Sequence, residues 1–222
     1  MKNLLDLVVA VFIITTNVFL GPKNVVKDNS LERRSEISIR SIKNEPDLKR
    51  VIFIFHKEKV RNISKIVSSK NIKYAKILGK LKWETLPVSY GINSDMYFGE
   101  IQRAFDECNS QLSTNLFAQP DSIINNSFIR DGFNTILWQP LSSFFGANAI
   151  AVTQLVYNSR RMTILEFDIA FNSDLAWGAG ADNTFDVYDV AMHELKQIIP
   201  LIDLRKKYII PDSKMYGYAP EE

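Results

Sequence analysis

Two long β-prone runs separated by a short polar turn constrain the fold of this chain more than any other feature. Residues 149–157 read Ala-Ile-Ala-Val-Thr-Gln-Leu-Val-Tyr, and residues 164–171 read Ile-Leu-Glu-Phe-Asp-Ile-Ala-Phe. In the second run one face of a strand carries Leu165, Phe167, Ile169 and Phe171, and the other carries Glu166, Asp168 and Asn172. A shorter β-prone run lies at residues 135–138, and helical patterns lie at both ends of this region. The order strand–helix–strands–helix predicts an α/β fold with one mixed sheet.

The helical pattern before these strands is amphipathic. Apolar residues recur at helical spacing over about residues 98–113, and Ser94 or Asp95 can cap the start of this helix. A strand is predicted just before it, at residues 87–93. We therefore place a main domain at residues 81–222.

Composition and net charge limit the kinds of molecule that this chain is expected to bind. The chain has 222 residues and a net charge of +2, from 27 basic and 25 acidic residues. Nucleic-acid-binding proteins usually carry a strong basic excess, so we predict no nucleic-acid partner. The single cysteine, Cys108, cannot form an intramolecular disulfide, and it falls on the apolar stripe of the first helix, which predicts a buried thiol. With only His56 and His193 in the chain, any metal site must use few imidazoles.

The N-terminus predicts export. Residues 4–20 are nearly all apolar, a length that suits the core of a secretory signal and is short for a membrane-spanning helix. Asp6 interrupts the start of this run, and no small-x-small cleavage site follows it. We predict that residues 1–22 form a signal peptide or a membrane anchor, so that the protein is secreted or is anchored to a membrane and faces outside. A buried core segment is the alternative.

Residues 23–80 form a second predicted region. Residues 23–49 are charge-rich, lack sustained periodicity and read as a linker. A strand at residues 50–55, a helical pattern near residues 60–67 and a strand at residues 72–78 follow. In an exported hydrolase, a small strand–helix–strand region ahead of the main domain is often a pro-segment, and we retain that interpretation.

The stretch with the clearest chemistry is residues 186–197. Asp186 can serve as the N-cap of a helix, with Asp189 three residues later, and an inward apolar face consists of Val187, Val190, Ala191, Leu195 and Ile198. His193 and Gln197 are four residues apart and project from the same side of the helix, with Glu194 next to His193. A neutral interpretation also exists, in which His193 is an ordinary helix histidine and Glu194 lies on a solvated face.

From about Trp83 to the C-terminus the chain resembles the matrixin-like metzincins, in particular the prokaryotic type whose zinc motif ends in aspartate. The segments that carry the resemblance are 86–88, 101–105, 115–117, 131–134 with Trp138, 150–153 with 157–158, 164–172, 185–194 and 215–218. The resemblance implies a zincin-like metallopeptidase domain with a twisted mixed sheet, one backing helix and one active-site helix.

The resemblance also implies roles for individual residues. His193 matches the first zinc ligand, Gln197 stands at the second ligand position, and Asp203 matches the third ligand. Glu194 matches the general base, and Met215 matches the methionine of the Met-turn below the metal. The expected substrate is a peptide or protein that lies alongside the edge strand, which by position is Ala149–Tyr157.

Three departures from the family pattern bear on activity. Gln197 replaces a histidine, and an amide oxygen binds zinc more weakly than an imidazole does. Pro200 stands where the family has a glycine that turns the chain sharply, and proline cannot make the same turn. The chain ends at Glu222, just after the Met-turn, where the family continues with a further helix, which suggests a C-terminally truncated domain.

Three functional hypotheses follow from the resemblance. The first is an exported zinc metalloendopeptidase with impaired activity. The second is an inactive pseudo-protease that binds peptides or proteins through the same cleft, and the third is an inert truncated remnant. Calcium is a further candidate cofactor, with oxygen ligands among Asp168, Asp174, Asp182 and Asp186, although their spacing matches no specific calcium motif and solvated loop carboxylates are the favoured interpretation.

Overall fold

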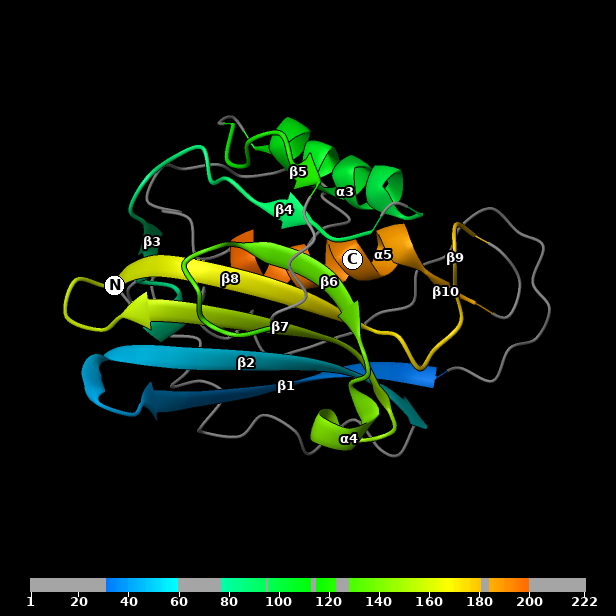
Figure 1. Ribbon diagram of the computed structural model, residues 1–222, viewed down its shortest axis with the longest axis horizontal. Helices are drawn as coiled ribbons and strands as arrows, with labels where there is room; N and C mark the ends of the chain where they lie inside the picture. Colours follow the sequence, from blue (N-terminus) through cyan, green and yellow to red (C-terminus); the bar gives the residue numbers. More distant parts are fainter. Residues whose placement is uncertain are drawn as a thin grey trace, which may run out of the picture.

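One mixed β-sheet organises the molecule. The computed structural model describes residues 31–59, 77–94, 96–112, 115–122, 128–180 and 184–199. Eight strands within these ranges form the sheet: β1 (Leu31–Ile42), β2 (Glu45–Lys59), β3 (Lys82–Trp83), β4 (Gly91–Ile92), β5 (Asp121–Ser122), β6 (Thr135–Gln139), β7 (Ala149–Asn158) and β8 (Thr163–Asn172). Their order is β1-β2-β7-β8-β6-β4-β5, and β3 pairs with β8 outside this path (Figure 1).

The sheet divides into a parallel half and an antiparallel half. The pairs β8–β6, β6–β4, β4–β5 and β3–β8 are parallel, whereas β1–β2, β2–β7 and β7–β8 are antiparallel. A second, two-stranded sheet pairs β9 (Trp177–Gly178) with β10 (Phe185–Asp186). The α/β class predicted from the sequence is confirmed at this level.

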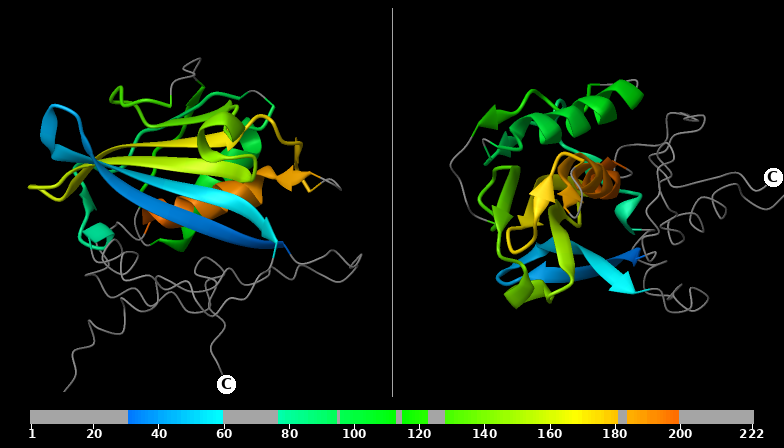
Figure 2. Two further views of the ribbon diagram at one scale, coloured as in Figure 1. Left: turned by 90° about the horizontal axis from the view of Figure 1, so that it is seen from below. Right: turned by 90° about the vertical axis from the view of Figure 1, so that its right-hand side faces the viewer.

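Two helices cover one face of the large sheet. They are α3 (Phe98–Gln111) and α5 (Val187–Ile198), which pack on each other (Figure 2). The main hydrophobic core lies between these helices and the sheet, and Phe55, Phe105, Phe167 and Phe171 are among its largest buried side chains. α3 and α5 are also joined at their buried faces, where Cys108 Sγ lies 3.8 Å from Met192 Sδ. The predicted burial of Cys108 is confirmed.

The opposite face of the sheet carries a smaller core and a polar row. The short helix α4 (Ser142–Phe145) lies beside this smaller core, which contains Leu137, Leu141, Ala149, Val152 and Ala170. Next to it, Thr135, Asp168 and Gln154 are register neighbours on β6, β8 and β7, and all three are buried. The polar side of residues 164–172 is therefore not a solvated face.

The N-terminal region differs from the prediction. Residues 31–49 are not a linker, because they form β1, the turn after it and the first part of β2. β2 pairs with β7 along the whole length from Leu48 to His56, so this region and the predicted main domain share one sheet. The predicted strand at residues 50–55 lies within β2 and is confirmed. Residues 60–76, with the predicted helix and most of the second predicted strand, lie outside the described residues, and the end of that strand is wrong because Ile77 and Leu78 are helical.

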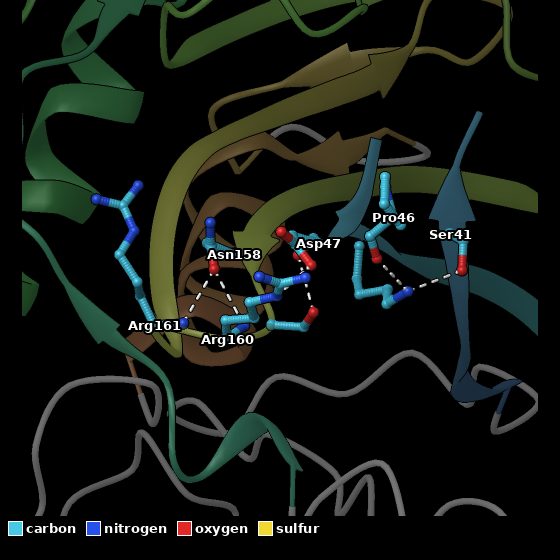
Figure 3. Close-up of polar contacts among 8 residues, drawn as sticks. Ser41, Pro46, Asp47, Asn158, Arg160 and Arg161 are labelled. Atoms are coloured by element: carbon cyan, nitrogen blue, oxygen red, sulfur yellow. Dashed lines mark hydrogen bonds and ion pairs between the residues drawn. The ribbon is translucent and has the colours of Figure 1, made fainter. Parts of the chain in front are cut away.

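Polar contacts fasten the β1–β2 hairpin to the turn between β7 and β8 (Figure 3). The carbonyl oxygen of Asp47 accepts hydrogen bonds from the backbone N–H of Ser159 at 2.7 Å and from its hydroxyl at 2.8 Å. Arg160 Nε lies 2.7 Å from Asp47 Oδ1, and Lys49 Nζ donates to Pro46 O and Ser41 Oγ, both at 2.9 Å. The ion pair is exposed and adds little stability, so the hydrogen bonds to the Asp47 carbonyl are what hold this end of β2 on β7.

No helix within the described ranges is both long and apolar enough to cross a membrane. The predicted signal peptide or anchor at residues 1–22 lies outside the described residues, and export stays a prediction.

Candidate functional site

Helix α5 carries three of the residues singled out by the sequence, and its start is fixed as predicted. The N-cap is Asp186, whose Oδ1 accepts a hydrogen bond from the backbone N–H of Asp189 at 2.9 Å. The cap satisfies one of the free N–H groups of the first turn. The predicted inward face is confirmed, because Val187, Val190, Ala191, Leu195 and Ile198 are all buried. This face holds α5 against α3 and β7.

Glu194 points into the interior and meets β7. Its side chain is fully buried, and its Oε2 accepts a hydrogen bond of 2.6 Å from the hydroxyl of Thr153. Burial raises the pKa of the Glu194 carboxyl to about 8, and the hydrogen bond from Thr153 opposes part of that rise. Oε1 is buried and has no hydrogen-bond partner among the described residues. One oxygen is thus held by the sheet, and the other is left without a partner.

His193 meets the N-terminal hairpin. Its imidazole is half-buried and stacks on the phenyl ring of Phe55 from β2, with ring centroids 3.9 Å apart and an interplanar angle of 18°. His193 and Glu194 therefore face different strands, β2 and β7, which are neighbours in the sheet.

Gln197 lies one turn after His193, on the same side of α5. Both its amide atoms, Oε1 and Nε2, are buried and have no hydrogen-bond partner among the described residues. A buried amide without partners costs about 1–3 kcal/mol of stability, so three orphaned atoms on adjacent turns of one helix are unusual. These three atoms make this part of α5 the candidate site among the described residues.

The fit of these residues to zinc is partial. His193 offers an imidazole nitrogen and Gln197 a weaker amide oxygen, which together make two of the three protein ligands of a catalytic zinc site. The predicted third ligand, Asp203, lies outside the described residues, as do Pro200 and Met215. Within the described part of the chain, no three His, Cys, Asp or Glu side chains are grouped so that they can hold a metal ion. Among the described residues, the chain thus offers two of the three protein ligands that a catalytic zinc site needs.

The carboxylates named as calcium candidates are separated in the structure. Asp186 caps α5, whereas Asp168 lies in the buried polar row on the opposite face of the sheet. Asp174 is exposed in the turn after β8, and Asp182 lies outside the described residues. The structure does not bring the three described carboxylates together.

The predicted edge strand is not an edge. β7 lies between β2 and β8, and its outer side pairs with β2 over the register from Leu48–Asn158 to His56–Ala149. The prediction was wrong because it treated residues 31–49 as a linker, which left β2 without a place in the sheet.

Two residues of the site were missed from the sequence. Thr153 is a polar interruption in the apolar run of β7, and that signal was enough to suggest an inward hydroxyl with a partner. Phe55 ends an apolar run and gave no sequence signal of its contact with His193, because the two residues meet only through the tertiary fold.

Comparisons with models of known protein families, with curated proteins and with solved structures found no match.

Proposed function

We propose that this chain is a degenerate zinc-dependent metalloendopeptidase with a zincin-like fold, in which α5 supplies the ligands His193 and Gln197 and the general base Glu194. The observation that carries the proposal is the set of orphaned atoms on α5: Glu194 Oε1 and both amide atoms of Gln197. The two helices on one face of a mixed sheet agree with the fold that the family resemblance implies.

In the proposed peptide hydrolysis, the metal ligands and the general base have separate roles. When bound, zinc supplies Lewis-acid polarisation of a scissile carbonyl. Thr153 holds Oε2 of Glu194 in place, so Oε1 would be the oxygen left to serve as the general base. Gln197 is the weak point, because its amide oxygen replaces an imidazole and lowers the affinity for zinc.

A test of the ligand assignment is the substitution Gln197→His. Loss of an outer-shell partner alone costs a metal site about 10–100-fold in affinity, so restoring a direct ligand should tighten zinc binding by roughly 100-fold. The measurement is competition with a chromophoric chelator, using the full chain. The variant Gln197→His, Pro200→Gly extends the test to the turn after the helix.

Two further variants make this test specific. In the Gln197→His background, His193→Ala should abolish the gain in zinc affinity, whereas Glu194→Ala should keep the zinc and lose any cleavage of casein. Zinc binding that is no tighter in Gln197→His than in the parent, or that survives His193→Ala, would contradict the assignment.

A second candidate function is an inactive pseudo-protease that binds a peptide or protein. The contact that favours it is the stack of Phe55 on His193, which packs an apolar ring against one face of the first candidate ligand. Casein cleavage by the Gln197→His, Pro200→Gly variant, with none by the parent at high concentration, would identify the parent as a disabled protease.

A further inference from the structure

A short segment ahead of β6 is tied to the sheet by a carboxylate. We call this segment, residues 129–133, the strap. The backbone N–H groups of Asp131 and Gly132 donate hydrogen bonds to Glu166 Oε1 at 3.2 Å and to Glu166 Oε2 at 2.8 Å. Glu166 belongs to β8 and is only 2% exposed. Both of its oxygens thus hold the middle of the strap, as the oxygens of an ionised carboxylate can.

The two ends of the strap are anchored independently of Glu166. On one side, the ring of Phe128 meets the ring of Phe145 edge-on, with centroids 6.5 Å apart. On the other side, Asn134 Nδ2 donates to the carbonyl oxygen of Ser89 at 2.7 Å, and Asn134 Oδ1 accepts from the backbone N–H of Phe167 at 2.8 Å. A movement of the strap can therefore be confined to the residues between Phe128 and Asn134.

The middle of the strap has few contacts that oppose its release. Ile129 and Phe133 are 60% and 68% exposed, so their release from the sheet loses little apolar burial. Arg130 pairs with Glu45 of β2, but both side chains are partly exposed, and such a pair contributes little stability. The two hydrogen bonds to Glu166 therefore carry much of the energy that keeps the strap closed, and local opening of such a segment costs far less than global unfolding.

Glu166 has a second buried carboxyl group as its neighbour. Asp168 lies two residues further along β8, on the same face of the sheet, and is fully buried. Its oxygens accept hydrogen bonds from the backbone N–H of Thr135 and from Gln154 Nε2. Burial is the main cause that raises the pKa of Asp168 to about 8, and the charge of Glu166 contributes. Near neutral pH Asp168 is therefore protonated, and its ionisation puts a second negative charge beside Glu166.

The other charged groups around this pair compensate a second charge poorly. They come from the strap and from the N-terminal hairpin: Arg130, Asp131, Glu45 and Arg50. Asp131 raises the pKa of both carboxyl groups, and Arg130, which lowers the pKa of Glu166, is partly exposed and already paired with Glu45. Arg50 lies in the same row of the sheet as Glu166, but with Val156 of β7 between them. Hydration is thus the way in which the pair can carry two charges.

We propose that the strap is a pH-sensitive cover over the Glu166–Asp168 pair, which is closed while Asp168 keeps its proton and opens to admit water when Asp168 gives that proton up to the solvent. Opening breaks the two hydrogen bonds from the strap to Glu166 and leaves the anchors at Phe128 and Asn134 in place. The pair lies on the face of the sheet opposite α5, so this device is separate from the proposed zinc site, and either proposal can fail without the other.

The direction of the pH effect follows from proton linkage. In the closed form the pKa of Asp168 is about 8, and water lowers it towards the ordinary value of an aspartate once the strap is open. The open form therefore binds fewer protons than the closed form. Opening becomes more favourable, by up to about tenfold per pH unit, as the pH rises towards about 8, and the effect levels off above that pH.

The test measures hydrogen exchange in the full chain by mass spectrometry, on the peptide that spans residues 128–134, with rates corrected for the intrinsic pH dependence of exchange. We expect the corrected rate to rise at least about tenfold between about pH 6 and about pH 8 in the parent, and to change less than about twofold in Asp168→Asn, which has no proton to lose. The internal control is the turn after β7, where Asn158 Oδ1, an uncharged acceptor, holds the backbone N–H groups of Arg160 and Arg161. The corrected rate of this turn should not change with pH.

A second variant tests the attachment of the strap directly. Glu166→Gln leaves one accepting oxygen in place of two, so the corrected exchange of the strap at about pH 6 should rise at least about tenfold. Glu84→Gln, the same change at an exposed carboxylate, should leave it within about twofold. The proposal is overturned by an Asp168→Asn profile that matches the parent, or by a strap that does not respond to Glu166→Gln. A rise with pH that α3 and β7 share equally would also overturn it, because that result indicates global unfolding.

Discussion

Phe105→Ala is expected to destabilise the fold by about 3–5 kcal/mol, the usual cost of replacing a buried phenylalanine by alanine. The ring is almost fully buried on α3 and stacks on Tyr90 with centroids 3.9 Å apart and an interplanar angle of 12°. It also meets Phe117 edge-on at 4.7 Å. These aromatic contacts add to the loss of buried area, so the cost should lie in the upper part of that range.

The measurement is the free energy of unfolding from denaturant titration, together with a thermal midpoint that should fall by about 10 °C. The matched control is Phe144→Ala on α4, where the side chain is 79% exposed and the change should stay within about 0.5 kcal/mol. A loss below about 1 kcal/mol for Phe105→Ala would mean that α3 does not close the main core. In that case the position of α5, which packs on α3, would also be in doubt.

The elements with strong periodicity were predictable from the sequence. Residues 149–157 and 164–171 lie within β7 and β8, residues 135–138 lie within β6, and the first helix begins at Phe98 as predicted. The cap of α5 by Asp186 was also predictable. In each case the signal is local, because the period of apolar residues and the capping pattern need no distant partner.

The N-terminal hairpin was not predictable by the same means. β1 contains Glu32-Arg33-Arg34 and Glu36, which suggest a solvated linker. Charged residues are nevertheless usual on an edge strand, and β1 forms one edge of the sheet in this structure. Its strand conformation follows from pairing with β2, and tertiary context of this kind overrides local propensity.

In the candidate site, too, some features were predictable from the local sequence and others depend on the tertiary fold. The relation of His193 to Gln197 follows from helix geometry alone and was predictable. The contacts that position these residues come from other elements: Thr153 on β7 donates a hydrogen bond to Glu194, and Phe55 on β2 stacks on His193. A sequence pattern on one helix can therefore name candidate catalytic groups, but the strands opposite that helix determine how far those groups are buried and what they contact.

The second prediction with a large expected effect concerns the pH dependence of stability. It arises from the row of buried polar side chains on the other face of the sheet, Thr135, Asp168 and Gln154. Asp168 is fully buried, and the pKa of its carboxyl is raised to about 8, chiefly by desolvation and in part by the nearby Glu166. Hydrogen bonds from Gln154 Nε2 at 3.0 Å and from the backbone N–H of Thr135 at 3.2 Å lower the pKa in part, and Asp131 raises it. Between pH 3.8 and about 8 the unfolded chain therefore releases a proton that the folded chain keeps.

Because the folded state binds more protons in this window, its stability falls as the pH rises and levels off above about pH 8. Asp168→Asn should remove this loss, since asparagine carries no charge. It can still accept from the N–H of Thr135, and it can donate to the side-chain oxygen of Gln154 once that amide turns over. We expect the free energy of unfolding of Asp168→Asn, relative to the parent, to rise by about 1.4 kcal/mol per pH unit between roughly pH 5 and pH 7.

The measurement is denaturant unfolding of both proteins at a series of pH values, with Asp174→Asn as the control. Asp174 lies exposed in the turn after the same strand, so the same chemical change there should leave the pH profile of the parent unaltered. Glu166 titrates in both Asp168→Asn and the parent, and its direct contribution is common to the two profiles. A difference between Asp168→Asn and the parent that stays constant with pH would show that Asp168 is ionised in the folded state. The polar row between β6, β8 and β7 would then hold a buried negative charge, which would need a cation or an ordered water network to balance it.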